Sequence, residues 1–481
     1  MLDNERELFR WGPIPGRLIA VVDTWRTISK TYPGRLHQYV WPESCTLFYR
    51  GSMIFLSHQA DLDNAGAKVF REVILTPRRK RMFGSWQECV RRLFAFCQGI
   101  TKTKLRHFSN QELMTEWRRF QLYIQKFWEA GIIQELGAYG GAPILCQALK
   151  KQGLKPEEVQ SAASILSAPE QLSFYQEEER DFFSLYKIRS RKKLEVALER
   201  HYRKYFWIEN SYGAIKFLAP KHFEQRLRKE KNAWRKKQRA IGFHLARVRS
   251  KKAEIIHRYN LPRHIQRLSQ GISLAIGWQD ERKSHIFHYL HYLELFLREF
   301  SRRSGIPLPY LYFSRASEIT TRADVVYRKF LRQRSRGPCA VLFTLKSSRI
   351  VAGRLARQIY RDFWLDKSNE KVDTLSGIVA HGGKDRVTGK VFIIRGPADL
   401  KRFPAGRILV TTMTAPEYIT AIRRAKAIIT DVGGITSHAA IVARELNIPC
   451  LVGTKRATRV LHTGERVIID MRIGNVKKIT T

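Results

Sequence analysis

The chain opens with apolar runs at strand spacing and then changes to a helical period. Residues 46–49 and 52–56 are mostly apolar, and an Arg-Gly pair between them favours a tight turn between two short strands. A Ser-Asn-Gln-Glu stretch from Ser109 has the form of a capping box, and apolar residues follow at helical spacing until Gly131. We expect residues 1–135 to form a small mixed α/β unit.

A helical pattern fills the middle of the chain. Apolar residues keep a helical period through most of residues 169–303, and two prolines interrupt it. We expect a helical domain over residues 136–335. Two β-branched runs then predict a second hairpin, and a helical segment and the polar residues 366–371 follow. Residues 336–373 are therefore interpreted as a hairpin, a helix and a linker.

The pattern changes again near Thr374, where short β-branched runs separated by glycine begin. Residues 427–430 predict a buried strand, residues 431–434 a glycine turn, and residues 438–446 a helix that starts at His438. The first turn of a helix combines unpaired backbone N–H groups with the positive end of the helix dipole, and both favour an anion. A phosphoryl group on His438 would lie in this position.

Taken alone, this motif leaves two interpretations open. In the first, Gly433 and Gly434 leave the ring of His438 approachable, and Thr436 and Ser437 donate hydrogen bonds to phosphoryl oxygens. In the second, the histidine packs or caps the helix start, and Thr436 or Ser437 serves as a helix cap. The surrounding sequence favours the first interpretation.

That sequence resembles the phosphohistidine swivelling domain of phosphoenolpyruvate-utilising enzymes, such as pyruvate phosphate dikinase, phosphoenolpyruvate synthase and rifampicin phosphotransferase. The run from Ala427 to Gly453, with its Gly-Gly-Ile-Thr-Ser-His core, carries the likeness. Residues 376–392 and 409–417 are similar to the earlier strands of that domain. The similarity extends to its closing strands at Thr458, Gly464, Asp470, Gly474 and Val476. One departure is Asp431, where glutamate is commoner in the family.

The resemblance implies that residues 374–481 form a β/β/α swivelling domain without a metal, in which His438 carries phosphate between two sites. The neutral ring would be the nucleophile. The residues at the phosphoryl group would be Gly433, Gly434, Thr436 and Ser437. Arg444 lies about 240° around the helix from His438, so a salt bridge or a surface position is expected rather than phosphate contact.

Enzymes of this family load the histidine from an ATP-grasp domain or from a phosphoenolpyruvate-binding barrel. The sequence offers no P-loop and no convincing ATP-grasp pattern, and no barrel follows before Thr481. We therefore expect no cofactor bound by this chain, a partner protein that supplies the ATP or phosphoenolpyruvate site with magnesium, and an unknown small-molecule acceptor. The competing class is a non-catalytic basic protein that binds nucleic acid or a partner and keeps the swivelling fold as a scaffold.

Composition supports a folded α+β multi-domain protein, mostly helical before residue 374, because 44% of the 481 residues are hydrophobic and 11% aromatic. The net charge of +44 is spread along the chain, so we expect nucleic acid to bind only non-specifically. Residues 221–252 form one dense basic cluster, interpreted as a solvated helical arm. The absence of a membrane span, a signal-peptide pattern or paired cysteines favours a cytoplasmic protein.

Two patterns in the helical region have alternative interpretations. His285, His288 and His291 recur every three residues after Glu281, which would suit a metal, but the interleaved aromatic residues favour a packed helix face. Residues 278–283 mix a tryptophan with several charges. They would suit the lining of a ligand cleft, although a solvated helix start is favoured.

Overall fold

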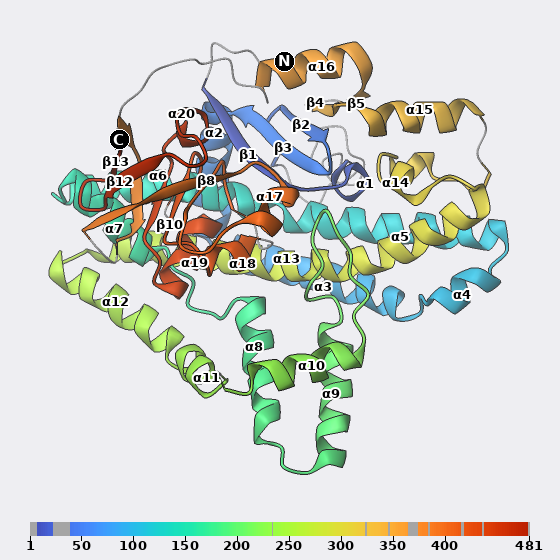
Figure 1. Ribbon diagram of the computed structural model, residues 1–481, viewed down its shortest axis with the longest axis horizontal. Coiled ribbons are helices and arrows are strands. Elements are labelled where there is room, and N and C mark those ends of the chain that lie inside the picture. The colour runs from blue at the N-terminus through green and yellow to red at the C-terminus, as the bar shows by residue number, and fades with distance from the viewer. Residues whose placement is uncertain are drawn as a thin grey trace.

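A computed structural model gives the architecture of the chain over residues 7–22, 39–232, 234–322, 325–344, 347–363, 374–382, 385–414, 418–434 and 437–479. The linker predicted at residues 366–371 lies outside these described ranges. A largely helical body is followed by a C-terminal domain rich in strands, so the expected α+β multi-domain class is confirmed (Figure 1). In the described part, no helix is both long enough and apolar enough to cross a membrane.

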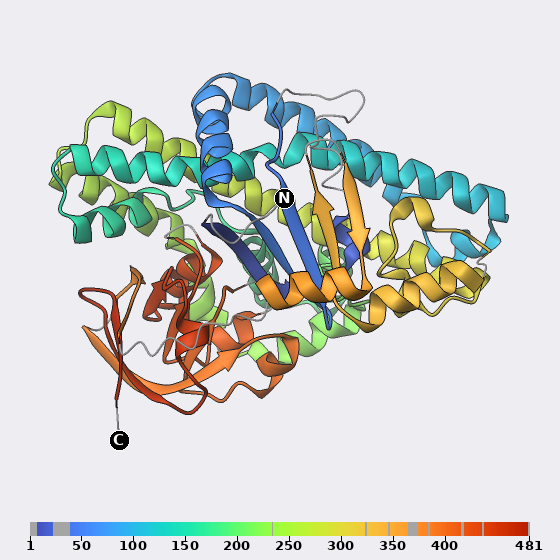
Figure 2. The ribbon, with the colours of Figure 1, turned by 90° about the horizontal axis from the view of Figure 1, so that it is seen from above.

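The first sheet combines strands from two distant parts of the chain. Its order is β1-β3-β2-β4-β5, and its strands are β1 (Leu8–Pro15), β2 (Ser44–Tyr49), β3 (Ser52–His58), β4 (Cys339–Phe343) and β5 (Ser348–Val351). Both predicted hairpins are confirmed, as β2–β3 and as β4–β5. Strand β4 pairs with β2, with Ala340 opposite Leu47, so the second hairpin lies in the same sheet as the N-terminal strands (Figure 2).

Helices surround this sheet and form most of the body. They are α1 (Leu18–Val21), α2 (Gln59–Val69) with a π-helical turn (Phe70–Ile74), α3 (Arg78–Gln98), α4 (Lys102–His107), α5 (Asn110–Gly131), α6 (Ile133–Lys151), α7 (Pro156–Leu166), α13 (Arg263–Ser304), α14 (Leu308–Leu311), α15 (Val325–Arg336) and α16 (Gly353–Phe363). The boundary expected at residue 135 falls within α6.

The long helices α5 and α13 follow the sequence signals closely. The predicted capping box is present, because the Ser109 hydroxyl accepts from the backbone N–H of Glu112 and the Glu112 carboxylate accepts from the backbone N–H of Ser109. Helix α13 ends before Gly305, which has a φ of 66°. Glycine adopts this left-handed backbone conformation readily, so it is a common helix terminator. Trp117 of α5 packs against Phe296 of α13 with the two rings tilted, and both are buried in the main core.

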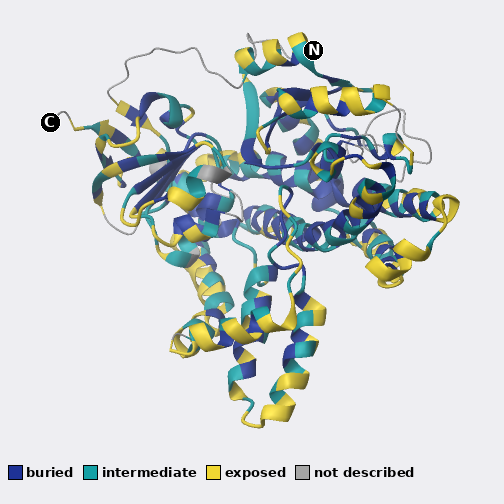
Figure 3. Cartoon of the chain, turned by 45° about the vertical axis from the view of Figure 1, so that its right-hand side comes forward, coloured by how far each residue is buried: buried dark blue, intermediate teal, exposed yellow. Residues whose placement is uncertain are grey.

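A helical arm projects from the body. It consists of α8 (Phe174–Ser184), α9 (Arg191–Tyr205), α10 (Pro220–Glu230), α11 (Trp234–Gly242) and α12 (His244–Arg258). Exposed residues cover much of the projecting part, and α12 returns towards α7 beside the C-terminal domain (Figures 1 and 3). The helical arm predicted over residues 221–252 is confirmed.

The C-terminal domain is built on an eight-stranded sheet of order β6-β13-β12-β8-β9-β10-β11-β7. Its strands are β6 (Thr374–Ser376), β7 (Ile378–His381), β8 (Arg386–Ile394), β9 (Ile408–Thr411), β10 (Ala427–Thr430), β11 (Cys450–Val452), β12 (Arg466–Asp470) and β13 (Asn475–Lys478). Its helices are α17 (Pro397–Arg402), α18 (Ile419–Ile422), α19 (His438–Leu446) and α20 (Ala457–Val460). Strand β8 pairs with β12 through its first half and with β9 through its second, so it joins the antiparallel and parallel parts.

The three histidines of α13 lie in a packed environment. The ring of His288 stacks on Phe94 and Trp207, and burial lowers its pKa to about 3. His285 lies against Trp86, and His291 against Phe206. Among the described residues, no group of three or more histidine, cysteine, aspartate or glutamate side chains is arranged to hold a metal ion.

Candidate functional site

His438 is the first residue of α19, as the sequence predicts, and it follows the turn after β10. The N-cap is Ser437, whose hydroxyl accepts a hydrogen bond from the backbone N–H of Ala440 at 3.4 Å. Helix α19 ends at Asn447 in the left-handed conformation. The expected strand, glycine turn and helix are therefore confirmed, and the histidine lies where the helix dipole is most positive.

The turn before the histidine is held by a buried carboxylate and needs one glycine. Asp431 accepts hydrogen bonds from the backbone N–H of Thr458 at 2.8 Å and from the Thr458 hydroxyl. Gly433 has a φ of 110°, and a Cβ there would lie 2.9 Å from the Cβ of Ser437. Gly434, in contrast, would place a Cβ in open space. Thr436 lies outside the described residues.

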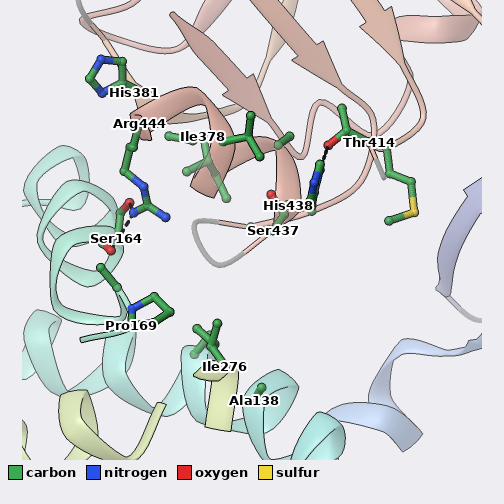
Figure 4. Close-up of a pocket in the computed structure, with 18 of the residues that line it drawn as sticks. Ala138, Ser164, Pro169, Ile276, Ile378, His381, Thr414, Ser437, His438 and Arg444 are labelled. Atoms are coloured by element: carbon green, nitrogen blue, oxygen red, sulfur yellow. Dashed lines mark hydrogen bonds between the residues drawn. The ribbon is translucent and has the colours of Figure 1, made fainter. Parts of the chain in front are cut away.

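A threonine that the sequence analysis did not single out holds the histidine ring. The Oγ1 atom of Thr414, three residues after β9, lies 2.9 Å from Nδ1 of His438. Thr414 is buried, so this contact is shielded from bulk water. Because Nδ1 is engaged with Thr414, Nε2 is the ring nitrogen left for the adjoining cavity (Figure 4). The signal was present in residues 409–417, which resemble a strand and turn of the swivelling domain.

The cavity lies between the C-terminal domain and the body, and its volume is about 2400 Å³. Ser437, His438 and Thr414 line one wall. Ala138 of α6 and Ile276 of α13 lie across from them (Figure 4). The C-terminal domain is packed against the body in this structure, and we call this arrangement docked. In it, His438 faces the body of its own chain.

Residues 278–283 lie in the middle of α13 and not at a solvated helix start, which corrects the favoured interpretation. Trp278 is buried, and Asp280 and Lys283 line the cavity, as the cleft alternative requires. Asp280 accepts a hydrogen bond at 2.9 Å from the backbone N–H of Phe174 at the start of α8. Burial raises the pKa of the Asp280 carboxyl to about 6.

The protein surroundings keep the His438 ring neutral. Burial, and to a lesser degree the positive charge of Lys283, lower its pKa to about 3. A neutral imidazole has a lone pair available on one ring nitrogen, so it can act as a nucleophile towards phosphorus. The side chain is half-buried, because the cavity leaves one side of the ring open.

The C-terminal domain docks on the body through a few polar contacts. Nη1 of Arg444 donates a hydrogen bond to the backbone oxygen of Ser164 in α7 at 2.7 Å and a second to its hydroxyl. The Tyr418 hydroxyl donates to the backbone oxygen of Pro13 at 3.4 Å. Arg444, which was expected in a salt bridge or at the surface, thus also contacts the body through Ser164.

Comparison with known proteins gives the class of the β/α domain that presents His438 at a helix N-terminus. Residues 403–474 match the family described as "PEP-utilising enzyme, mobile domain". The resemblance to the swivelling domain of phosphoenolpyruvate-utilising enzymes is therefore confirmed for this segment, which forms a mobile domain of that type.

Named relatives match the same part of the chain. The phosphoenolpyruvate synthase of Pyrococcus furiosus is 53% identical over 90 residues, which are 19% of this chain and 11% of that protein. The uncharacterized phosphotransferase YvkC of Bacillus subtilis is 43% identical over 104 residues, which are 22% of this chain and 12% of that protein. The matching region thus spans about a tenth of the length of these relatives, which places the domain, but not the whole chain, among phosphoryl-transfer proteins.

The low pKa of His438 gives a testable dependence on pH. A histidine whose pKa is depressed in the folded state contributes stability above the unfolded value near 6.5, and this contribution is lost as the pH falls towards the folded value. Between pH 6.5 and 5, we expect His438→Gln to lose less stability than the wild type, with a difference of at most about 2 kcal/mol. Chemical denaturation across this range measures it.

The exposed His257 on α12 provides the control. His257→Gln should follow the wild-type pH profile. The histidines of α13 are present in the wild type and in both variants, so their contribution to the pH dependence cancels in the comparison. If His438→Gln and the wild type lose the same stability between pH 6.5 and 5, the ring is not held neutral by its docked surroundings.

Proposed function

We propose that the protein transfers a phosphoryl group through His438, as a phosphotransferase of the phosphoenolpyruvate-utilising type. The observation that carries the proposal is the geometry of the ring: Nδ1 is engaged by Thr414, and Nε2 is left for a cavity shared with the body. The helix N-terminus of α19 and the ammonium group of Lys283 add positive potential near the ring.

In the loading step, Nε2 attacks the phosphorus of the donor, an N–P bond forms, and the bond from phosphorus to the donor's leaving oxygen breaks. The ring must then carry its proton on Nδ1, where the Thr414 hydroxyl accepts the hydrogen bond. Gly433, Gly434 and Ser437 are proposed to surround the phosphoryl oxygens, because the two glycines lie in the turn before α19 and Ser437 is its N-cap. Thr436 is proposed to join them from its place in the sequence.

In the unloading step, an oxygen of a small-molecule acceptor in the cavity attacks phosphorus, and the electron pair of the N–P bond returns to Nε2. The docked arrangement fits this step, since His438 faces the body and the cavity of about 2400 Å³ has room for an acceptor. Loading would then require the domain to leave the body and meet a partner that holds ATP or phosphoenolpyruvate with magnesium.

The proposal is tested by incubating the full chain with ³²P-labelled phosphoenolpyruvate or ATP, with and without an extract of the host cells as the source of the partner. We expect protein-bound label that is lost in acid and stable in alkali, as is typical of a phosphoramidate. Label that is stable in acid, or no label with either donor and the extract, would reject the phosphohistidine.

A further inference from the structure

Helices α15 and α16, on the side of the body away from the helical arm, expose a group of apolar side chains. Val325 and Val326, at the start of α15, are 80% and 76% exposed, more than any other large apolar side chain in the described ranges. Phe330 of α15 and Leu355 of α16 are exposed as well. Single apolar residues on a surface need no explanation, but a group of them indicates a contact surface.

Exposed cations share these helices and repeat at the same spacing on both. They are Lys329, Arg332 and Arg336 on α15 and Arg354, Arg357 and Arg361 on α16. Positions i, i+3 and i+7 lie on one face of a helix, so each set of three forms a row. As far as the structure describes the chain, none of the six forms an ion pair. The only acid in the sequence of the two helices is Asp362.

The two helices meet, and their exposed sides point away from the body. A Cβ on Gly353, the first residue of α16, would lie 3.2 Å from Nε2 of Gln333 in α15. Leu331 of α15 and Ala356 of α16 are fully buried on the inner sides. Figures 1 and 2 show the helices in line along one edge of the body, and in Figure 1 the helical arm projects from the opposite side. A flat surface can therefore approach both helices without meeting the arm.

We infer that α15 and α16 bind the surface of an anionic lipid bilayer. Lipid phosphate groups complement the two rows of cations, and the exposed apolar side chains can enter the boundary between headgroups and acyl chains. A nucleic acid would use the cations but has no apolar layer for Val325, Val326 and Phe330. The combination of both kinds of side chain therefore favours a bilayer. This inference goes beyond the proposed function and does not depend on it.

The inference is tested by co-sedimentation of the full chain with vesicles of phosphatidylcholine and phosphatidylglycerol in equal parts, in about 150 mM KCl. We expect binding to these vesicles and none to phosphatidylcholine alone. Lys329→Gln with Arg332→Gln should weaken binding about tenfold or more, because each cation contributes to attraction by the anionic surface. Val326→Ser with Phe330→Ser should weaken it about fivefold or more, because less apolar area is buried.

The helical arm offers matched controls for both variants. Lys192→Gln with Arg200→Gln removes two exposed cations of α9, which form no ion pair within the described ranges. Val196→Ser with Phe243→Ser removes an exposed valine and an exposed phenylalanine. Both controls should bind the anionic vesicles as the wild type does. A thermal melt of each protein checks that the substitutions leave the fold intact.

Several results would overturn the inference. Equal weakening in the charge variant and its control would show attraction by net charge alone. Absence of binding to the anionic vesicles, or equal binding to both kinds of vesicle, would exclude recognition of anionic lipid. Unchanged binding in the apolar variant would show that the cations attract any polyanion, and a synthetic RNA that the charge variant binds more weakly would then assign them to nucleic acid.

The phosphohistidine has no part in this test. His438→Ala should bind the anionic vesicles as the wild type does, because His438 lies on the C-terminal domain and not on α15 or α16. Vesicle binding therefore decides the inference whether or not the chain acquires a phosphoryl group.

Discussion

Replacement of His438 by alanine is expected to abolish the acid-labile, alkali-stable label completely, because it removes the ring nitrogen that would hold the phosphoryl group. The ring lies on the wall of a cavity and is half-buried, so its loss should change the free energy of unfolding by only about 1 kcal/mol. Quantified ³²P incorporation, combined with a thermal melt, separates a chemical defect from an unfolded protein.

His381 offers a matched control, since it is a second histidine on the wall of the same cavity and belongs to the same domain. His381→Ala should incorporate label as the wild type does. Label that persists in His438→Ala, or that is mapped to Ser437 by mass spectrometry, would contradict the assignment of His438 as the carrier.

Thr414→Val is expected to slow label incorporation by about tenfold to a hundredfold while leaving the fold intact. Valine keeps the shape of the side chain but removes the oxygen that lies 2.9 Å from Nδ1. The ring can then exchange its proton between the two nitrogens, and the fraction with a free lone pair on Nε2 falls. Thr414 acts on the donor only through the ring, so it is a positioning residue.

Two measurements separate this effect from a structural defect. Thr414→Ser retains the hydroxyl and should recover most of the incorporation rate. In addition, the ¹⁵N chemical shifts of His438, obtained with ¹⁵N-labelled histidine, should show protonated Nδ1 in the wild type and a mixture of tautomers in Thr414→Val. Equal incorporation by the valine and serine variants would rule out a role for the hydroxyl group.

The C-terminal site could be predicted to an unusual extent, because its signals are local. A strand, a turn that needs Gly433, and a helix that begins after Ser437 are all properties of neighbouring residues. The capping box at Ser109 is local in the same sense, and so is the hairpin of β2 and β3. Each of these elements was predicted close to the bounds that the structure has.

The other side of the site could not be predicted, because it depends on contacts between segments far apart in the sequence. No local pattern shows that Asp280 and Lys283 lie opposite His438, and the charges around them favoured a solvated helix start instead. Arg444 was expected to form a salt bridge or to lie on the surface. Two of its hydrogen bonds go to Ser164, which is 280 positions earlier in the chain.

The first sheet also affects the order in which the protein can form. Strand β4 follows its neighbour β2 in the sheet only after about 290 residues of intervening chain, so this pairing has a very high sequence separation. During synthesis from the N-terminus, the edge of β2 that β4 covers has no partner until those residues have been made. Until then, the hairpin of β2 and β3 presents an unpaired strand edge, which favours aggregation of the nascent chain.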